Sequence, residues 1–392
     1  MTSVLFVHDF PIKYEASTEK FYSNGFSYEI WKRYLNVFDK VKVASRLSSK
    51  DIKNDAQSSG PNVSFQPIKE YTSIKKLILN YSKISKNLEN QIDKADCVII
   101  RLPSVLGFVA ANICIRKKKK YMVEVVGSMF DTYWNFGGLF AKVLALPSEI
   151  IQKRSIKHAS IAVYITQNYL QSKYPSKGEM FNGVSNVIVK DELVKNDLFQ
   201  DEITLDSPVQ IGIVGSTYVR YKGHFIAVDT IKKLKEKGYN VQLQMVGQGL
   251  DESLSNYIKE LGVDNEVIYK GMLNSEKEMD KWYQQLDMYI QPSKTEGHGR
   301  AVVEAISNRV PVFTSNVGGL PDSVNEEFQF PIKHPEKLVN LLIKGIEDKM
   351  FLKRNIQENF KNIKKYRRSL ISDKRNEALN ELKRIVNEEV EK

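Results

Sequence analysis

Short apolar runs alternate with segments of helical periodicity along the first half of the chain. The predicted strands are VLFV, VKVAS, CVIIRL, KYMVEVVGS and ASIAVYIT, and the stretches SYEIWKRYLNVF and VLGFVAANICIRK between them repeat apolar residues at helical spacing. Short strands separated by amphipathic helices are typical of a parallel sheet with crossover helices. We therefore predict one α/β domain over residues 1–185.

The second half shows the same alternation more clearly. Its predicted strands are VQIGIVGS, VQLQMVGQG, EVIYKG, MYIQPS and VPVFTS, each separated from the next by a helical stretch that ends in a glycine or a polar break. The polar segment KDELVKNDLFQDEITLD separates the two halves. The pattern predicts a linker at 186–207, a doubly wound domain of five strands at 208–360, and helices at 361–392 that could return to the N-terminal domain.

Composition supports a soluble globular protein, with 42% hydrophobic and 27% charged residues in 392. Cys97 and Cys114 lie in apolar runs, so we expect buried free thiols and a reducing compartment. The N-terminus has no basic leader, and no window holds eighteen uncharged apolar residues. The expected location is the cytoplasm.

The net charge of +11 calls for an anionic partner or a solvated basic surface. Much of the excess lies in RKKKKY and KNIKKYRR. Nucleic acid, anionic lipid and phosphorylated substrates would all suit such patches. No nucleic-acid-binding module is visible, and the basic residues are not interleaved with aromatic ones, so a nucleic-acid partner is not expected.

Four loops that follow predicted strands of the second half carry most of its glycines. They read GSTYVRYKG, VGQG, KGML and SKTEGHGR. Doubly wound sheets bind ligands in loops at the carboxyl ends of their strands, and glycine lets the backbone approach a ligand closely. These loops are the predicted ligand site.

The segment SKTEGHGRAVVEA holds two carboxylates, Glu296 and Glu304, eight positions apart. A helix is expected to begin near Arg300, and its free N–H groups would form an anion site for a diphosphate. Arg220 and Lys222, from the first loop, would supply cations. Glu304 could accept hydrogen bonds from ribose hydroxyls, whereas Glu296 would lie nearer the domain cleft. The alternative is a surface helix residue at Glu304.

These segments resemble the nucleotide-binding domain of family 4 glycosyltransferases, which are retaining enzymes of the GT-B fold. The resemblance rests on GIVGSTYVRYKG, VQLQMVGQG, VIYKGML and the E-x7-E segment, followed by VPVFTSNVGGLPDSV. MFNGVSNV and SIAVYITQNYLQSKYP match more loosely, so the resemblance covers about residues 95–345. It implies two Rossmann-like, doubly wound domains facing a cleft, and a nucleotide-diphosphate sugar as donor.

Site residues follow from the resemblance position by position. It implies that Glu304 binds the donor ribose, that Lys222 binds the diphosphate and that Glu296 faces the donor sugar. The implied catalytic residues are Glu296, Lys222 and Arg220. The implied donor-binding residues are Gly215, Ser216, Lys222, Gly247, Lys270, Gly297, His298, Gly299, Arg300, Ala301 and Glu304. The acceptor-side candidates are His8, Asn24, Gly25, Gly127, Ser128 and Asp131.

Two positions depart from the family pattern. Ser216 stands where many members have an arginine, and Arg220 could replace it. The N-domain stretch MVEVVGSMFD lacks the usual histidine and offers Glu124, Gly127, Ser128 and Asp131 instead. His8 and Asp9 are expected to end the first strand at the edge of the cleft.

The predicted reaction is retaining transfer of a hexose or N-acetylhexosamine, with UDP favoured, to a sugar or lipid-linked acceptor in cell-surface glycan synthesis. No cofactor or metal is expected, because the chain lacks Asp-x-Asp and its histidines are scattered. A sugar-nucleotide epimerase and a non-catalytic nucleotide-sugar-binding subunit remain alternatives. The stretch from Gly137 to His158 mixes apolar and basic residues. It predicts either a helix that lies peripherally on an anionic membrane or a buried crossover helix with a basic outer face.

Overall fold

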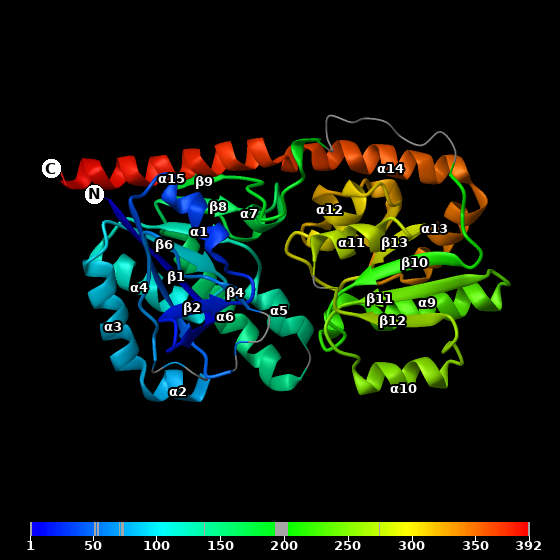
Figure 1. Ribbon diagram of the computed structural model, residues 1–392, viewed down its shortest axis with the longest axis horizontal. Helices are drawn as coiled ribbons and strands as arrows, with labels where there is room; N and C mark the ends of the chain where they lie inside the picture. Colours follow the sequence, from blue (N-terminus) through cyan, green and yellow to red (C-terminus); the bar gives the residue numbers. More distant parts are fainter. Residues whose placement is uncertain are drawn as a thin grey trace.

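The computed structural model of the protein describes residues 2–50, 52, 55–69, 71, 74–136, 138–192, 203–273 and 275–390. Two α/β domains lie side by side, and a pair of long C-terminal helices runs along the upper edge of both (Figure 1). Residues 193–202 of the predicted linker, and Gly137, lie outside the described residues.

The N-terminal domain is built on a nine-stranded sheet. Its parallel strands lie side by side in the order β5 (Val63–Phe65), β3 (Lys40–Leu47), β1 (Ser3–Glu15), β6 (Cys97–Leu102), β7 (Met122–Val125), β8 (Ile161–Tyr164) and β9 (Glu179–Phe181). The antiparallel strands β2 (Lys20–Ser23) and β4 (Ala56–Gln57) extend it beside the second half of β1. The order starts in the middle and winds outward both ways, which is the doubly wound topology.

Alternation along β1 places residues on both faces of this sheet. Val4 and Phe6 join the core on the side of α1 (Tyr28–Leu35), whereas Leu5 and Val7 join the core on the side of α3 (Tyr81–Asp93) and α4 (Val105–Lys117). The remaining helices of the domain are α2 (Ile74–Leu79), α5 (Met129–Phe136), α6 (Leu139–Lys157) and α7 (Tyr169–Lys173). A sheet covered on both faces needs strands that are apolar throughout, as the sequence pattern indicated.

The first strand does not end at His8 and Asp9, so that expectation was wrong. β1 continues to Glu15, with a register shift against β3 between Val7 and Pro11. The irregular segment bends the strand, and its second half pairs with β2. Asp9 lies in this irregular segment and accepts a hydrogen bond from the backbone N–H of Val105 at 2.7 Å. Cys97 and Cys114 are buried free thiols, as predicted.

The C-terminal domain is built on a six-stranded parallel sheet. Its strands lie in the order β12 (Val267–Gly271), β11 (Val241–Val246), β10 (Val209–Val214), β13 (Met288–Gln291), β14 (Val312–Ser315) and β15 (Gln329–Phe330). The five predicted strands are all present, and β15 is an addition whose two residues are too few to give a periodic signal. The direction of winding reverses between β10 and β13, so ligand-binding loops are expected after these two strands.

Helices cover this second sheet on both faces. They are α9 (His224–Glu236), α10 (Glu252–Glu260), α11 (Glu276–Tyr283), α12 (Arg300–Ser307), α13 (Glu336–Glu347) and α14 (Lys349–Ile363). Short 3₁₀ turns occur at η1 (Arg220–Lys222), η2 (Leu320–Asp322), η3 (Glu326–Phe328) and η4 (Lys364–Tyr366).

The last helix, α15 (Arg368–Val390), leaves the C-terminal domain and packs on the N-terminal one (Figure 1). Its buried residues Ile371, Leu379 and Leu382 share a core with α1. Lys383 Nζ donates to the carbonyl of Val37 at 2.9 Å, and Arg375 Nη2 donates to the carbonyl of Ser185 at 3.0 Å. The helix therefore ties the two domains together across the cleft.

Candidate functional site

The loops after β10 and β13 are held against each other at the reversal point of the C-terminal sheet. Gly223 has φ +86°, and a Cβ there would lie 2.0 Å from the carbonyl oxygen of Pro292. The backbone N–H of Lys294 donates to the carbonyl of Tyr221 at 2.7 Å. Only glycine permits this approach at such a φ, and the approach brings Lys222 and Glu296 together.

Lys222 and Glu296 form an ion pair, with Nζ 2.7 Å from Oε2. Both side chains are partly buried, at 26% and 13% exposure. Ser293 Oγ lies 3.4 Å from the same carboxylate oxygen, and Gln291 Nε2 donates to the carbonyl of Lys222 at 3.4 Å. An ammonium has three donors, so Lys222 can hold Glu296 and a second anion at once.

Two adjacent glycines, Gly318 and Gly319, pack closely against the turn after Glu296. A Cβ on Gly318 would lie 1.9 Å from the carbonyl oxygen of Glu296, and one on Gly319 would lie 2.2 Å from that of Gly297. In front, a Cβ on Gly297 would lie 2.9 Å from the carbonyl oxygen of Val126 in the N-terminal domain. The Val-Gly-Gly-Leu-Pro segment therefore positions the turn, a role that its pattern alone did not reveal.

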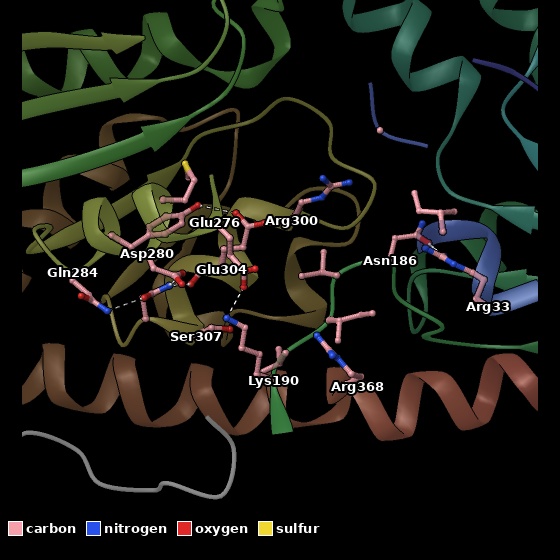
Figure 2. Close-up of a pocket in the computed structure, with 18 residues that line it drawn as sticks. Arg33, Asn186, Lys190, Glu276, Asp280, Gln284, Arg300, Glu304, Ser307 and Arg368 are labelled. Carbon is pink, nitrogen blue, oxygen red and sulfur yellow. Dashed lines mark hydrogen bonds and ion pairs between the residues drawn. The ribbon is translucent and has the colours of Figure 1, made fainter. Parts of the chain in front are cut away.

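Glu304, one turn into α12, faces a cavity of about 580 Å³ between the domains (Figure 2). Tyr283 donates its hydroxyl hydrogen to Oε2 of Glu304 at 3.2 Å. Burial raises the pKa of this carboxyl. Glu304 is thus not a surface helix residue: its carboxylate is half-buried and turned toward the cavity.

Cations from distant parts of the chain line the same cavity, and Figure 2 shows them on both sides of it. They are Arg33, Lys190, Arg300 and Arg368. Gly25 lines it too, so the structure brings this acceptor-side candidate to the cavity that Glu304 faces. Only Arg300 was expected among the four cations, because the other three come from segments without a motif. Lys190 is held by Glu276, with Nζ 2.6 Å from Oε1.

Several predicted donor-binding residues pack loop against loop. A Cβ on Gly247 would lie 2.0 Å from the carbonyl oxygen of Gly215, and Ser216 Oγ donates to the carbonyl of Gln248 at 3.1 Å. The carbonyl of Ala301 lies 3.2 Å from the Tyr283 hydroxyl and shares its one hydrogen with Glu304. Lys270 is exposed on β12. The glycines after β10 and β11 thus have a packing role as well as the predicted binding role.

Arg220 is not brought to the ion pair of Lys222 and Glu296. Its Nη2 donates to Ser253 Oγ at 3.1 Å, and its guanidinium lies over the ring of Phe225 at 5.6 Å. η1 is a 3₁₀ turn with three residues per turn, so side chains two positions apart point in different directions. The suggested replacement of the missing family arginine by Arg220 stays a prediction.

The N-domain loop after β7 reaches the cleft through its backbone. Ser128 Oγ accepts from the N–H of Asp131 at 3.1 Å at the start of α5, and Gly127 accepts from Gln152 Nε2 at 2.7 Å. Asp131 Oδ1 lies 2.6 Å from Lys173 Nζ. These acceptor-side candidates hold α5 in place, and α5 lies beside η1 of the other domain.

Glu124, the other carboxylate of this stretch, is buried in the N-terminal core. It accepts from Tyr34 at 2.7 Å and pairs with Arg101 at 2.9 Å. The structure therefore assigns it to the core rather than to the cleft.

His8 and Asn24 lie on the N-terminal side. The ring of His8 packs near Phe10 and Phe26, its Nδ1 accepts from the N–H of Phe10 at 3.0 Å, and burial lowers its pKa to about 3. A neutral imidazole is therefore expected at physiological pH. Asn24 is exposed in the loop beside Gly25.

His298, in the turn, is directed into the domain rather than toward open space. It is 6% exposed, and its ring lies 4.6 Å from that of Tyr366. Burial, with smaller contributions from Lys365 and Arg300, lowers its pKa to about 4.

This lowered pKa predicts a loss of stability in acid. Between its usual value near 6.5 and about 4, the unfolded chain binds a proton at His298 that the folded chain does not. The free energy of unfolding should therefore fall with falling pH over this window, by up to about 1.4 kcal/mol per pH unit for this residue. In thermal melts at about pH 4.5 to 7.5, His298→Leu should flatten the dependence. The exposed His334→Leu serves as the control, and equal slopes for both variants would contradict the assignment.

Within the described ranges, no three His, Cys, Asp or Glu side chains gather as metal ligands would. Of the helices described, none combines the length and the apolar character needed to cross a bilayer.

Known sequences resemble this chain over part or nearly all of its length. Residues 196–366 match the family described as glycosyl transferases group 1. Protein CapJ of Staphylococcus aureus is 45% identical over 388 residues, which is 98% of this chain and 97% of CapJ. The capsular polysaccharide biosynthesis glycosyltransferase CapM of the same organism is 32% identical over 119 residues, covering 29% of this chain and 30% of CapM.

Solved structures share the two-domain fold. Sucrose-phosphate synthase from Thermosynechococcus elongatus superposes with a TM-score of 0.70 at 13% identity, over 97% of this chain and 99% of that one. HepE of Anabaena, in complex with UDP and glucose, superposes with a TM-score of 0.67 at 13% identity, over 97% and 100%. At these identities the likeness establishes the GT-B architecture alone. Given that fold, the family match and the full-length similarity to CapJ, this chain belongs to the glycosyl transferases of group 1.

Proposed function

We propose that this protein transfers a hexose or N-acetylhexosamine from a UDP-sugar to a sugar or lipid-linked acceptor during synthesis of a cell-surface polysaccharide. Family membership supports sugar transfer, the named role of CapM supports the polysaccharide, and the UDP and glucose bound by HepE support the donor. One observation carries the proposal: Arg300 and Glu304 of α12 line an interdomain cavity, and Glu296, in the turn just before α12, is paired with Lys222.

The donor would lie across the start of α12. Its ribose hydroxyls would donate to Glu304, whose carboxylate is already turned toward the cavity. Its diphosphate would lie between Lys222 and the first N–H groups of α12, at Arg300 and Ala301, which have no intrahelical acceptor. The sugar would then face the Gly297 turn and Glu296. Gly215, Ser216, Gly247 and Lys270 are proposed as surrounding donor contacts.

Transfer would proceed with retention and without a metal. The bond between the anomeric carbon and the diphosphate breaks as the acceptor oxygen bonds to the same face, and the acceptor proton passes to the leaving phosphate. Negative charge develops on that phosphate, so the positioned ammonium of Lys222 stabilises the transition state. Because the leaving group takes the proton, no enzymic base is needed. Glu124, the carboxylate of the N-domain stretch that lacks the usual histidine, is buried in the core and paired with Arg101, so it is not proposed as a base.

The acceptor would approach from the N-terminal side, past Gly25 and the start of α5. A lipid-linked acceptor is met at the inner face of the cell membrane. The proposal therefore includes a cytoplasmic protein that attaches peripherally to that surface.

Glu304→Ala is expected to weaken UDP binding by about 10- to 100-fold, because hydrogen bonds to a charged group contribute about 1.5–3 kcal/mol. In a thermal shift panel of nucleotides and nucleotide sugars, a ligand at a hundredfold excess over its Kd should stabilise the wild type by about 2.7 kcal/mol. The exposed helix variant Glu260→Ala is the control and should keep the full shift. The proposed donor site is wrong if no nucleotide raises the melting temperature of the wild type, or if UDP raises that of Glu304→Ala by the same amount.

Two other activities fit the same donor site and are separated by product analysis. A sugar-nucleotide epimerase would convert UDP-sugar to its epimer when no acceptor is present. A non-catalytic subunit would bind UDP-sugar and release no UDP with any acceptor. The proposed transferase should instead release UDP in proportion to the acceptor that it modifies.

A further inference from the structure

The outer face of α6 exposes a row of large apolar side chains. Leu139, Phe140, Val143, Leu146 and Ile150 are 62–81% exposed. Leu139, Val143, Leu146 and Ile150 follow one another at steps of four, three and four residues, which places them on one stripe of the helix, and Phe140 lies next to it. Single exposed apolar side chains are common on soluble proteins, but a continuous row marks an interaction surface.

The inner face of the same helix has the opposite character. Its buried residues include Ala145, Ser148, Gln152 and Ser155. Gln152 donates to Gly127 at 2.7 Å and accepts from the N–H of Met129 at 2.9 Å, so the polar side holds the start of α5. A helix that buries its small and polar residues and exposes its large apolar ones is oriented for a partner outside the domain.

Cations border the apolar row. Lys142, Lys153, Arg154 and Lys157 are exposed along α6. Glu149, the one carboxylate in the helix, accepts from the hydroxyl of Tyr174 at 2.6 Å through Oε2, and its Oε1 lies 3.3 Å from Lys153 Nζ. Trp134 on α5 is 47% exposed, and Lys142 Nζ lies 5.5 Å from the centre of its ring. An apolar stripe with basic flanks and a tryptophan matches helices that lie in the interface of an anionic bilayer.

The charge of this face favours lipid over a second copy of the chain. A twofold dimer would set the row of one copy on that of the other and bring the same cations together. An anionic lipid surface satisfies the cations and buries the apolar row at once.

The position of α6 would place an attached membrane close to the cleft. α6 packs on α5, and α5 lies beside η1, which carries Lys222. Figure 1 places α5 and α6 at the lower edge of the N-terminal domain, toward the C-terminal one. A bilayer against α6 would therefore lie near the α5 side of the cleft.

We propose that the outer face of α6, together with Trp134, docks on an anionic lipid bilayer and presents the α5 side of the cleft to a lipid-linked acceptor. The docking surface stands on the exposed face itself. Only the delivery of an acceptor rests on the proposed transferase function.

The test is sedimentation of the full chain with vesicles of phosphatidylcholine, with and without about 30% phosphatidylglycerol, at about 0.02 M and 0.15 M salt. Wild type should bind the anionic vesicles, more strongly at low salt. The variant Val143→Ser/Leu146→Ser/Ile150→Ser should bind at least about 10-fold more weakly, and Lys153→Glu/Lys157→Glu should lose the preference for anionic lipid. The matched controls Met350→Ser and Lys349→Glu, on exposed positions of α14, should bind as wild type.

Trp134 provides a second readout, since Trp31 and Trp282 are buried. Brominated lipid should quench the fluorescence of wild type but not that of Trp134→Phe. No binding at low salt, or equal binding by wild type and the triple variant, would overturn the proposal. So would a wild-type dimer that dissociates in the triple variant, because a second copy would then cover the face.

Vesicle binding is measured without donor or acceptor, and each α6 variant is checked for an unchanged melting temperature and an unchanged shift with UDP. A loss of lipid binding with the UDP shift intact concerns α6 alone. A missing UDP shift with lipid binding intact refutes the donor site and leaves the docking surface standing.

Discussion

Replacing Lys222 by Met is expected to lower kcat by about 10²- to 10³-fold, the usual effect of removing one positioned group that stabilises transition-state charge. Met keeps most of the apolar stem and removes the ammonium. That ammonium lies 2.7 Å from Glu296 at the point where the sheet reverses, so the loss should fall on the step in which the diphosphate gains charge. The measurement is UDP release at saturating donor and acceptor.

The control for this variant is Lys233→Met, an exposed lysine in the helix that follows the same loop. A structural role for Lys222 must also be separated from a chemical one, because its removal leaves the partly buried Glu296 without its cation. The double variant Lys222→Met/Glu296→Gln removes both charges. If Lys222 acts on the diphosphate, kcat stays low; recovery of kcat in the double variant would show that Lys222 serves only to hold Glu296.

Gly223→Ala is expected to destabilise the protein by about 2–4 kcal/mol and to abolish transfer. The new Cβ would lie 2.0 Å from the carbonyl oxygen and 2.5 Å from the carbonyl carbon of Pro292, and this backbone leaves it no room. The loops after β10 and β13 must separate, which also moves Lys222 away from Glu296. Denaturant unfolding and UDP release measure the two effects.

Gly238→Ala is the matched control because Gly238 follows the other end of the same helix, α9. Its φ is +84° against +86° at Gly223, yet nothing lies within 4 Å of the Cβ that it would gain. Gly238→Ala should therefore lower the free energy of unfolding only by the backbone penalty of a positive φ, about 1–2 kcal/mol, and the variant should retain activity. Equal losses in the two variants would mean that the close approach to Pro292 contributes nothing.

Local pattern was sufficient for much of the fold. The alternation of apolar runs with helical stretches correctly predicted the five longer strands of the C-terminal domain, and the start of α12 at Arg300 followed from the glycines before it. Such features depend on residues close in sequence, where spacing alone selects strand or helix. β15 was not predicted because its two residues are too few to show a period. The continuation of β1 past His8 was not predicted because it depends on pairing with β2.

The surroundings of the candidate site depended on distant segments. Arg33, Lys190 and Arg368 carry no motif, and only the packing of the linker and α15 across both domains places them around the cavity that Glu304 faces. Arg220 and Lys222 looked equivalent in sequence, and the 3₁₀ turn sends them in different directions.

The helix from Leu139 to Lys157 shows what the sequence determined and what only the tertiary structure decided. By itself the sequence determined that the helix is amphipathic and basic, and it left open whether the apolar stripe faces inward or outward. Only the tertiary structure decided this. The side facing the domain must hydrogen-bond the start of α5, and Gln152 can do so while Leu146 and Ile150 cannot. A sequence sets the faces of a helix through local periodicity, but the neighbours that each face meets are set by the rest of the chain.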